Sequence, residues 1–239
     1  MNGTALLYTA VAASANVIGA AAVVSRSRWS VRALENMVAL SAGFMVSVAL
    51  LDLAPEAVIT HGASAGVVIL LGYLLVHLTQ HTLAPHFHFG EEVHSVTKVV
   101  SFSALAGLML HTFVDGVAIA SGFGVSESLG LLVFFAILLH KLPEGLAISS
   151  LFLASGESRP RALAASGVLA LSSLAGAILT QRLPLLGQYG LPLAAGVTLY
   201  VGASNLVPEF QGKSGWRLPA SFFAGCALYY LARQLVGQG

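Results

Sequence analysis

Residues 111–152 contain one short pattern twice. The first copy reads His111-Thr-Phe-Val-Asp115-Gly-Val-Ala-Ile, and the second, 29 positions later, reads His140-Lys-Leu-Pro-Glu144-Gly-Leu-Ala-Ile. In each copy a histidine and a carboxylate are four residues apart, so on a helix they share one face. Both copies lie in long apolar runs, where ionisable side chains are expensive and usually functional. The stretch therefore predicts two membrane helices that hold four ligands for a divalent metal ion in transit.

The composition of the whole chain indicates a membrane protein. Of its 239 residues, 56% are hydrophobic and 9% are charged, and the mean hydropathy is +0.85. Soluble domains carry about 25% charged residues. We therefore expect an all-α, polytopic fold, with residues 1–239 forming a single transmembrane domain. The net charge of +1, without a basic run, excludes nucleic acid as a partner. The single cysteine, Cys226, excludes an internal disulfide and a cysteine-rich zinc module.

Eight apolar segments, each close to the roughly 20 residues that span a hydrocarbon core, predict eight transmembrane helices. They cover about residues 4–24, 34–59, 64–82, 97–121, 127–154, 161–181, 189–209 and 217–236. Eight basic residues fall in the odd-numbered loops between them: Arg26, Arg28, Arg32, Lys98, Arg159, Arg161, Lys213 and Arg217. The other side has only Arg182 and Arg233. Because cytoplasmic loops are enriched in Lys and Arg, we predict that both termini lie outside and the third loop lies in the cytoplasm.

A second repeat relates the second segment to the seventh. Ala42-Gly43 through Leu53-Ala54-Pro55-Glu56 matches Ala195-Gly196 through Leu206-Val207-Pro208-Glu209 at an offset of 153. The two segments are an odd number of crossings apart, so the copies run in opposite directions through the bilayer. This predicts an inverted repeat of helices 1–3 and 6–8 around helices 4–5. Such repeats are common in secondary transporters, whose substrate sites lie near the midplane.

The ligand types at the paired motif limit the choice of metal. Imidazole and carboxylate suit Zn²⁺, and also Fe²⁺ or Mn²⁺, while the lack of a thiolate argues against copper(I). The alternative is that His111 and Asp115 form a hydrogen bond that only serves packing. An unpaired aspartate in a bilayer costs about 2.5–3.5 kcal/mol. Asp115 and Glu144 share one internal lysine, so packing explains them poorly.

A proline and two glycines accompany the ligands. Pro143 removes the hydrogen bond to the carbonyl group of Leu139 and kinks the helix. We expect the freed carbonyl to face a cavity one turn before the ligands. Gly116 and Gly145 follow the two carboxylates and allow another helix to approach closely, although general packing of membrane helices explains them equally well.

These stretches resemble the signature helices of the ZIP (Zrt/Irt-like) family of divalent metal transporters. That family has a His-Asn-x-x-[Asp/Glu]-Gly pattern on its fourth helix and a His/Gln-x-x-Pro-[Glu/His] pattern on its fifth. Residues 51–56 and 205–209 are similar to its second and seventh helices. The resemblance extends over nearly the whole chain. It implies a ZIP-type bundle, a homodimer and an elevator-like motion of helices 1, 4, 5 and 6 against helices 2, 3, 7 and 8.

By this resemblance the principal metal site consists of His111, Asp115, His140 and Glu144. Many ZIP proteins hold a second metal, whose ligands include the positions occupied here by Thr112 and Lys141. Some also use a carboxylate in the sixth helix, and residues 161–181 contain none. A protonated lysine has donors and no acceptor. We therefore predict a mononuclear site in which Lys141 replaces the second ion and pairs with the two carboxylates. Pairing that serves only helix packing is the alternative.

Other polar residues have open roles. Five histidines lie in or beside the third loop: His77, His81, His86, His88 and His94. Imidazoles at this density bind metals such as Zn²⁺. We expect the loop, about residues 83–96, to bind metal in the cytoplasm, as similar ZIP loops are thought to do. A solvated linker is the alternative. Three carboxylates near segment ends are candidates for lining the approach to the site, although they are equally explained as facing water: Asp52, Glu56 and Glu209.

The function that follows is transport of a divalent transition metal into the cytoplasm. Zn²⁺ is favoured as the transported substrate, with Fe²⁺, Mn²⁺ and Cd²⁺ as further candidates. The short loops indicate a plasma membrane, the bacterial inner membrane in particular. No enzyme is expected, because an intramembrane metalloenzyme needs a free general base and no His-Glu-x-x-His motif occurs. A metal-sensing membrane protein is the other alternative.

Overall fold

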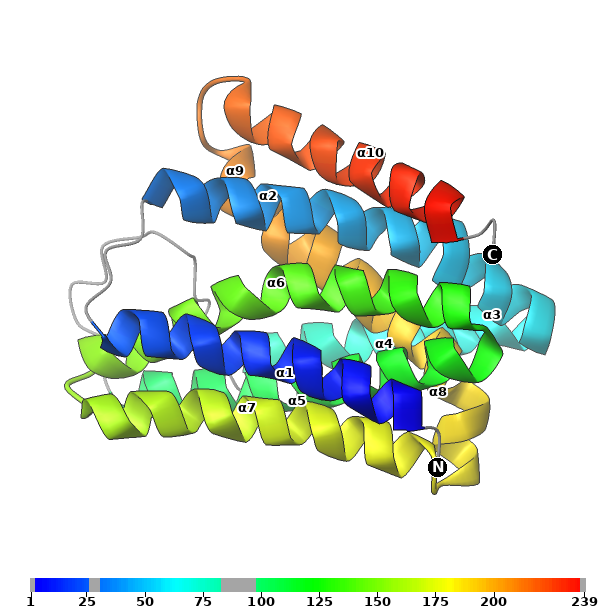
Figure 1. Ribbon diagram of the computed structural model, residues 1–239, viewed down its shortest axis with the longest axis horizontal. Coiled ribbons are helices and arrows are strands. Elements are labelled where there is room, and N and C mark those ends of the chain that lie inside the picture. Colours follow the sequence, from blue (N-terminus) through cyan, green and yellow to red (C-terminus); the bar gives the residue numbers. More distant parts are fainter. Residues whose placement is uncertain (1–2, 26–30, 83–97, 237–239) are drawn as a thin grey trace.

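Long helices form because a helix satisfies its own backbone hydrogen bonds where no water is present. The computed structural model describes residues 3–25, 31–82 and 98–236. Of the residues in these ranges, 92% are helical and none lies in a strand. The helices run roughly along one common direction (Figure 1). The all-α fold predicted from the sequence is therefore confirmed.

Ten α-helices and two π-helical segments make up the described part of the chain. The α-helices are α1 (Gly3–Val24), α2 (Val31–Val48), α3 (Ala54–His61), α4 (Ser64–Thr82), α5 (Lys98–Val125), α6 (Glu127–Ala154), α7 (Arg159–Thr180), α8 (Pro184–Leu199), α9 (Pro208–Gln211) and α10 (Arg217–Val236). The π-helical segments are Ala49–Leu53, between α2 and α3, and Tyr200–Leu206, between α8 and α9.

Five helical stretches in the described residues are long and apolar enough to cross a membrane. They are Gly3–Val24, Glu35–His61, Ser101–Val125, Glu127–Ala154 and Arg159–Thr180. The apolar part of α4, Ser64–Thr79, is shorter. In addition, α8 has 16 residues before its π-helical segment begins. Length and apolarity therefore support five crossings, and the count of eight remains a prediction.

Both π-helical segments end two residues before a proline of the repeated stretch. The amide of Ala54 donates to the carbonyl of Ala49, and the amide of Val207 donates to that of Gly202, so both bonds span five residues. The two bonds are 153 positions apart. A proline cannot donate a backbone hydrogen bond, and single π-turns inside helices are frequently found at functional sites.

Four helix pairs pack backbone against backbone at reciprocal glycines. A methyl group added to any of these glycines would lie 1.8–2.4 Å from a carbonyl oxygen of the partner helix. The pairs are Gly19 with Gly145 (α1 and α6), Gly116 with Gly176 (α5 and α7), Gly43 with Gly225 (α2 and α10), and Gly72 with Gly196 (α4 and α8). The predicted close approach at Gly116 and Gly145 is confirmed. The partners are α7 and α1, so each ligand-bearing helix is held by a different neighbour.

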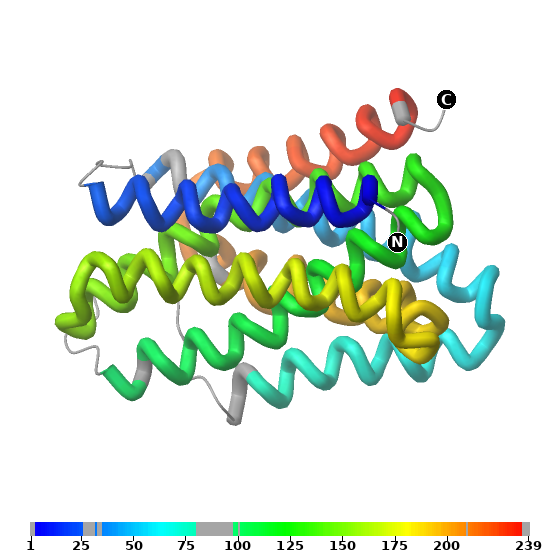
Figure 2. The backbone as a smooth tube through the Cα atoms, turned by 60° about the horizontal axis from the view of Figure 1, so that its bottom comes forward, coloured from blue at the N-terminus to red at the C-terminus, as the bar shows by residue number. Residues whose placement is uncertain are grey.

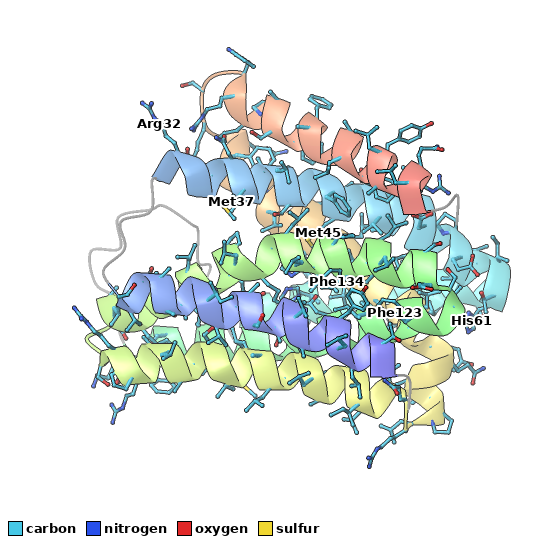
Figure 3. All side chains as sticks on the ribbon, in the orientation of Figure 1. Arg32, Met37, Met45, His61, Phe123 and Phe134 are labelled. Carbon is cyan, nitrogen blue, oxygen red and sulfur yellow. The ribbon has the colours of Figure 1, made fainter. Side chains whose placement is uncertain are left out.

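The start of α1 and the end of α10 lie at the same end of the bundle, as both views show (Figures 1 and 2). Phe123 and Phe134 lie toward this end (Figure 3), and Tyr8 of α1 packs on both, with ring centroids 5.1 and 4.8 Å away. Arg32 lies at the opposite end. The aromatic rings join α1 to α5 and α6 on the side of the termini.

A buried carboxylate ties the start of α5 to the turn between α6 and α7. Glu157 accepts from Arg161 at 2.6 Å and pairs with Lys98 at 3.2 Å. The hydrogen bond from Arg161, followed by that from Lys98, holds the pKa of the Glu157 carboxyl below its usual range. The carboxylate therefore stays charged at neutral pH. Its stabilising contribution is present above the unfolded-state pKa and is lost as acid protonates the folded protein.

Candidate metal centre

Helices α5 and α6 bring the four predicted ligands together in the interior. In Figure 1, α6 lies between α1 and α2, and α5 is packed against α7. Each ligand-bearing helix places its histidine one turn before its carboxylate. One ligand atom from each of the four side chains lies within 4.8 Å of all the others, and all four residues are buried: His111, Asp115, His140 and Glu144.

The spacing of these atoms is close to that around a tetrahedral zinc ion. Nε2 of His111 is 3.5 Å from Oδ2 of Asp115 and 3.8 Å from Oε2 of Glu144. Nε2 of His140 is 3.4 and 3.9 Å from the same two oxygens. Zinc bonds of about 2.0–2.1 Å place tetrahedral ligands about 3.3 Å apart. These four His–carboxylate separations exceed that spacing by a few tenths of an ångström, and the four ligand atoms as a set lie within 4.8 Å of one another, so the side chains would have to move inward around an ion.

One of the two histidines has a backbone acceptor for its Nδ1 proton, which suits metal binding through Nε2. Nδ1 of His140 lies 3.1 Å from the carbonyl oxygen of Ala136, which can only accept. In the neutral ring that donates from Nδ1 to this carbonyl, Nε2 keeps the lone pair that a metal ion would use. Nδ1 of His111 is buried and has no hydrogen-bond partner among the described residues.

Lys141 occupies the edge of the same centre and is fully buried. Its Nζ lies 2.7 Å from Oδ2 of Asp115 and 3.1 Å from Oε2 of Glu144. These are the two oxygens that face the histidines. The ammonium and an incoming ion would therefore compete for the same lone pairs. With two carboxylates and one ammonium, the centre carries one net negative charge when the histidines are neutral.

Thr112 is the other residue at a position that binds a second ion in many ZIP proteins, and its side chain is hydrogen-bonded to the backbone of its own helix. Its hydroxyl donates to the carbonyl oxygen of Met109 at 3.1 Å, and the side chain is buried. This hydrogen bond occupies the hydroxyl proton within α5.

The carbonyl group freed by Pro143 does not face a cavity, so that prediction is wrong. The hydroxyl of Ser41 on α2 donates to the carbonyl oxygen of Leu139 at 3.0 Å. A buried carbonyl without a partner is unfavourable, and a neighbouring helix satisfies this one. The proline therefore creates a contact between α2 and α6.

Two residues absent from the sequence prediction complete the surroundings of Glu144. Asn16 of α1 donates through Nδ2 to Oε1 of Glu144 at 3.0 Å. Ser166 of α7 donates to Oδ1 of Asn16 at 2.8 Å. The signal that could have identified Asn16 is an amide in the middle of an apolar helix, because such a group needs a polar partner.

The carboxylates predicted to line the approach are not part of the centre. Asp52 accepts from the hydroxyl of Tyr229 at 2.5 Å and pairs with Nε of Arg233 at 3.0 Å, so it is bound to α10. Glu56 lies in the first turn of α3, where the hydroxyl of Thr60 is 3.4 Å from its Oε1. The side chain of Glu209 lies outside the described residues.

The predicted histidine loop is largely outside the described part of the chain. His86, His88 and His94 all fall in residues 83–97, and of His81 only the helical backbone is described. His77 lies within α4, where its ring centroid is 5.7 Å from that of Tyr200. Metal binding by this loop therefore stays a prediction.

A pocket of about 500 Å³ lies at the end of the bundle that holds the termini. It is lined by the C-terminal ends of α3, α5 and α7 and by the start of α8, and His61 and Ser121 contribute to it. Ser121 follows Asp115 by six residues on α5, which is about 9 Å along a helix. The pocket is thus close to the ligands along the helix axis.

Sequence comparisons relate the chain to zinc transporters. The family described as ZIP zinc transporter matches residues 79–232. "Zinc transporter ZIP9" of Micropogonias undulatus is 30% identical over 163 residues, covering 63% of this chain and 53% of that protein. "Zinc transporter SLC39A7" of Mus musculus is 32% identical over 130 residues, covering 50% of this chain and 27% of that protein. "Zinc transporter zipt-7.2" of Caenorhabditis elegans is 26% identical over 146 residues, covering 56% and 32%. The chain thus matches about half or less of the length of these relatives.

Proposed function

Because the chain belongs to the ZIP zinc transporter family, we propose that it carries a divalent metal ion, zinc in the first place, across a membrane into the cytoplasm. The observation that carries this proposal is the centre on α5 and α6, whose four buried ligand atoms lie within 4.8 Å of one another. The relatives named as zinc transporters favour zinc. Fe²⁺, Mn²⁺ and Cd²⁺ accept the same ligands and are further candidates. The family is one of transporters and not of enzymes.

We propose that the centre binds one ion and that Lys141 takes the place of a second. The ammonium is 2.7 and 3.1 Å from the two carboxylates, and no carboxylate occurs in residues 161–181. A transported ion must also leave again. Competition from Lys141 for Oδ2 of Asp115 and Oε2 of Glu144 weakens binding and supports release.

The architecture that we propose has eight crossings and an inverted repeat, within one transmembrane domain over residues 1–239. Two structural observations support the repeat. The π-type hydrogen bonds before Pro55 and Pro208 are 153 positions apart. The interlocking pair Gly43 and Gly225 corresponds to Gly196 and Gly72 at the same offset, with the helix order exchanged.

The packing also supports an elevator-like motion. The four glycine interlocks join α1 to α6, α5 to α7, α2 to α10 and α4 to α8. Each interlock lies within one of the two groups that the family resemblance implies, one of α1, α5, α6 and α7 and the other of α2, α4, α8 and α10. Between the groups, Gly190 of α8 faces side-chain atoms of Ser121 and Val117 rather than a backbone. Side chains can rearrange where a backbone interlock cannot. We propose that the first group carries the ion as one body.

The orientation that we propose places both termini outside, in a bacterial inner membrane, and the loop at about residues 83–96 in the cytoplasm. The termini and the pocket lined by His61 and Ser121 lie at the same end of the bundle. In this orientation the pocket is the outer mouth of the route to the centre. A homodimer is proposed from the family resemblance.

Zinc uptake into proteoliposomes tests this function. We expect vesicles that contain the protein and an enclosed zinc indicator to accumulate zinc faster than protein-free vesicles, and unlabelled Fe²⁺, Mn²⁺ or Cd²⁺ to compete to the degree that each is a substrate. A metal-sensing protein would bind zinc without moving it, and a metalloenzyme would cleave a substrate instead. Uptake equal to that of protein-free vesicles would refute the proposal.

A further inference from the structure

We propose that Asn16 is a positioning residue of the metal centre, which fixes the rotation of the Glu144 carboxylate so that one defined oxygen faces the ion. This inference rests on the proposed function. Asn16 lies on α1, whereas the four proposed ligands lie on α5 and α6. It acts through Glu144 and does not itself reach the histidines in the described contacts.

The contacts of Asn16 divide the two oxygens of Glu144 between separate tasks. Oε1 accepts from the amide of Asn16 at 3.0 Å. Oε2 faces Nε2 of His111 at 3.8 Å and Nε2 of His140 at 3.9 Å. Asn16 is fully buried, so water does not compete for its amide. One oxygen is thereby held by α1, and the other faces the two histidines and Nζ of Lys141, with which an ion would compete.

The orientation of the amide follows from chemistry alone. A carboxylate only accepts hydrogen bonds, so the NH₂ group of Asn16 must face Glu144. Its carbonyl oxygen must then face Ser166, whose hydroxyl donates to it at 2.8 Å. Ser166 comes from α7 and is also fully buried. The chain of hydrogen bonds therefore runs in one direction, from α7 through α1 to the ligand on α6.

The backbone holds Asn16 at this place as well. A methyl group on Gly145 would lie 1.9 Å from the backbone oxygen of Asn16 and 2.9 Å from its Oδ1. A methyl group on Gly19 would lie 2.3 Å from the backbone oxygen of Leu142. The two helices thus interlock on both sides of the ligand, and the amide has little room to turn away.

Loss of the Asn16 amide would change the orientation in which the Glu144 carboxylate faces the ion. Oε1 would have no donor except Nζ of Lys141, which is already 3.5 Å away. The carboxylate would then turn toward the ammonium with both oxygens and present less of either to zinc. Groups that hydrogen-bond a metal ligand typically change metal affinity or activity by about 10–100-fold when they are removed.

The test compares three variants in zinc uptake by proteoliposomes. Asn16→Leu removes the donor at similar size, and Ser166→Ala removes only the group that fixes the amide. Thr9→Val is the matched control, because Thr9 is a fully buried residue of α1 that bonds its own helix at Ala5. We expect the apparent KM for zinc to rise about 10-fold or more in Asn16→Leu. We expect a smaller rise in Ser166→Ala and none in Thr9→Val.

The split between KM and maximal rate separates positioning from a general structural role. A misfolded fraction lowers the maximal rate and leaves KM unchanged. The double variant Asn16→Leu/Ser166→Ala should have the KM of Asn16→Leu, because Ser166 acts only through the amide. A native KM in folded Asn16→Leu would overturn the inference and leave the proposed function standing. If Asn16→Leu does not fold, a native KM in Ser166→Ala overturns it. Absence of uptake by the native protein would instead refute the proposed function.

Discussion

Zinc uptake by His111→Ala and by Glu144→Ala is expected to fall to the level of protein-free vesicles. Each variant deletes one of four ligand atoms that lie within 4.8 Å of one another. The Glu144 variant also leaves the amide of Asn16 without its acceptor and takes one of the two carboxylates from Lys141. The loss should exceed the roughly 100-fold that removal of an outer-shell group can cause. Initial rates of zinc entry measure it.

The matched control for this loss is Glu127→Ala, which removes an exposed carboxylate in the first turn of the same helix, α6. It should transport zinc at the native rate. Equal helical content and elution of all variants in detergent would show that the fold is kept. Near-native uptake by both His111→Ala and Glu144→Ala would refute the assignment of the centre.

Lys141→Met is expected to bind zinc more tightly and to release it more slowly. The change keeps the length of the side chain and removes the ammonium that lies 2.7 Å from Asp115 and 3.1 Å from Glu144. The metal-free variant then holds two buried carboxylates without a cation. Breaking a buried ion pair costs about 3–5 kcal/mol. Zinc should restore that stability, because a ligand that binds only the folded state stabilises it.

Thermal unfolding in detergent, with and without zinc, measures this effect. The metal-free Lys141→Met variant should unfold at a lower temperature than the native protein and gain more from added zinc. In uptake, its KM and its maximal rate should both fall. Arg182→Met, which changes an exposed basic residue between α7 and α8, is the control. A zinc-induced shift equal to the native one would mean that Lys141 serves only helix packing.

The ligand set could be predicted from the sequence because its geometry is local. A histidine and a carboxylate four residues apart share a helix face wherever the helix lies. The two copies lie on adjacent helical segments, so the two ligand-bearing faces were expected to pack against each other. His111 and Asp115 therefore meet His140 and Glu144 as the pattern predicts. The all-α fold could be predicted for the same reason, because each long apolar run in a bilayer must satisfy its own backbone hydrogen bonds by forming a helix.

Contacts between distant segments could not be predicted in the same way. Asn16 meets Glu144 across 128 residues and Ser41 meets Leu139 across 98. Asp52 was expected near the approach to the site, yet Tyr229 and Arg233 hold it against α10. In each case the partner is determined by how helices pack, which a single sequence does not record. Asn16 and Ser41 are polar residues within apolar helices. A residue of this kind predicts that a polar contact exists, but the sequence does not show which residue is the partner.

The proposed site for a single ion is tested most directly by locating zinc with anomalous X-ray diffraction at the zinc absorption edge, using crystals soaked in zinc. We expect one strong peak in the interior of each chain, within about 2.0–2.2 Å of the ligand atoms of His111, Asp115, His140 and Glu144. Nζ of Lys141 should lie beside that peak, shifted from its present contacts. Two peaks between α5 and α6, or a peak elsewhere with none among these four side chains, would contradict a single-ion site at these ligands.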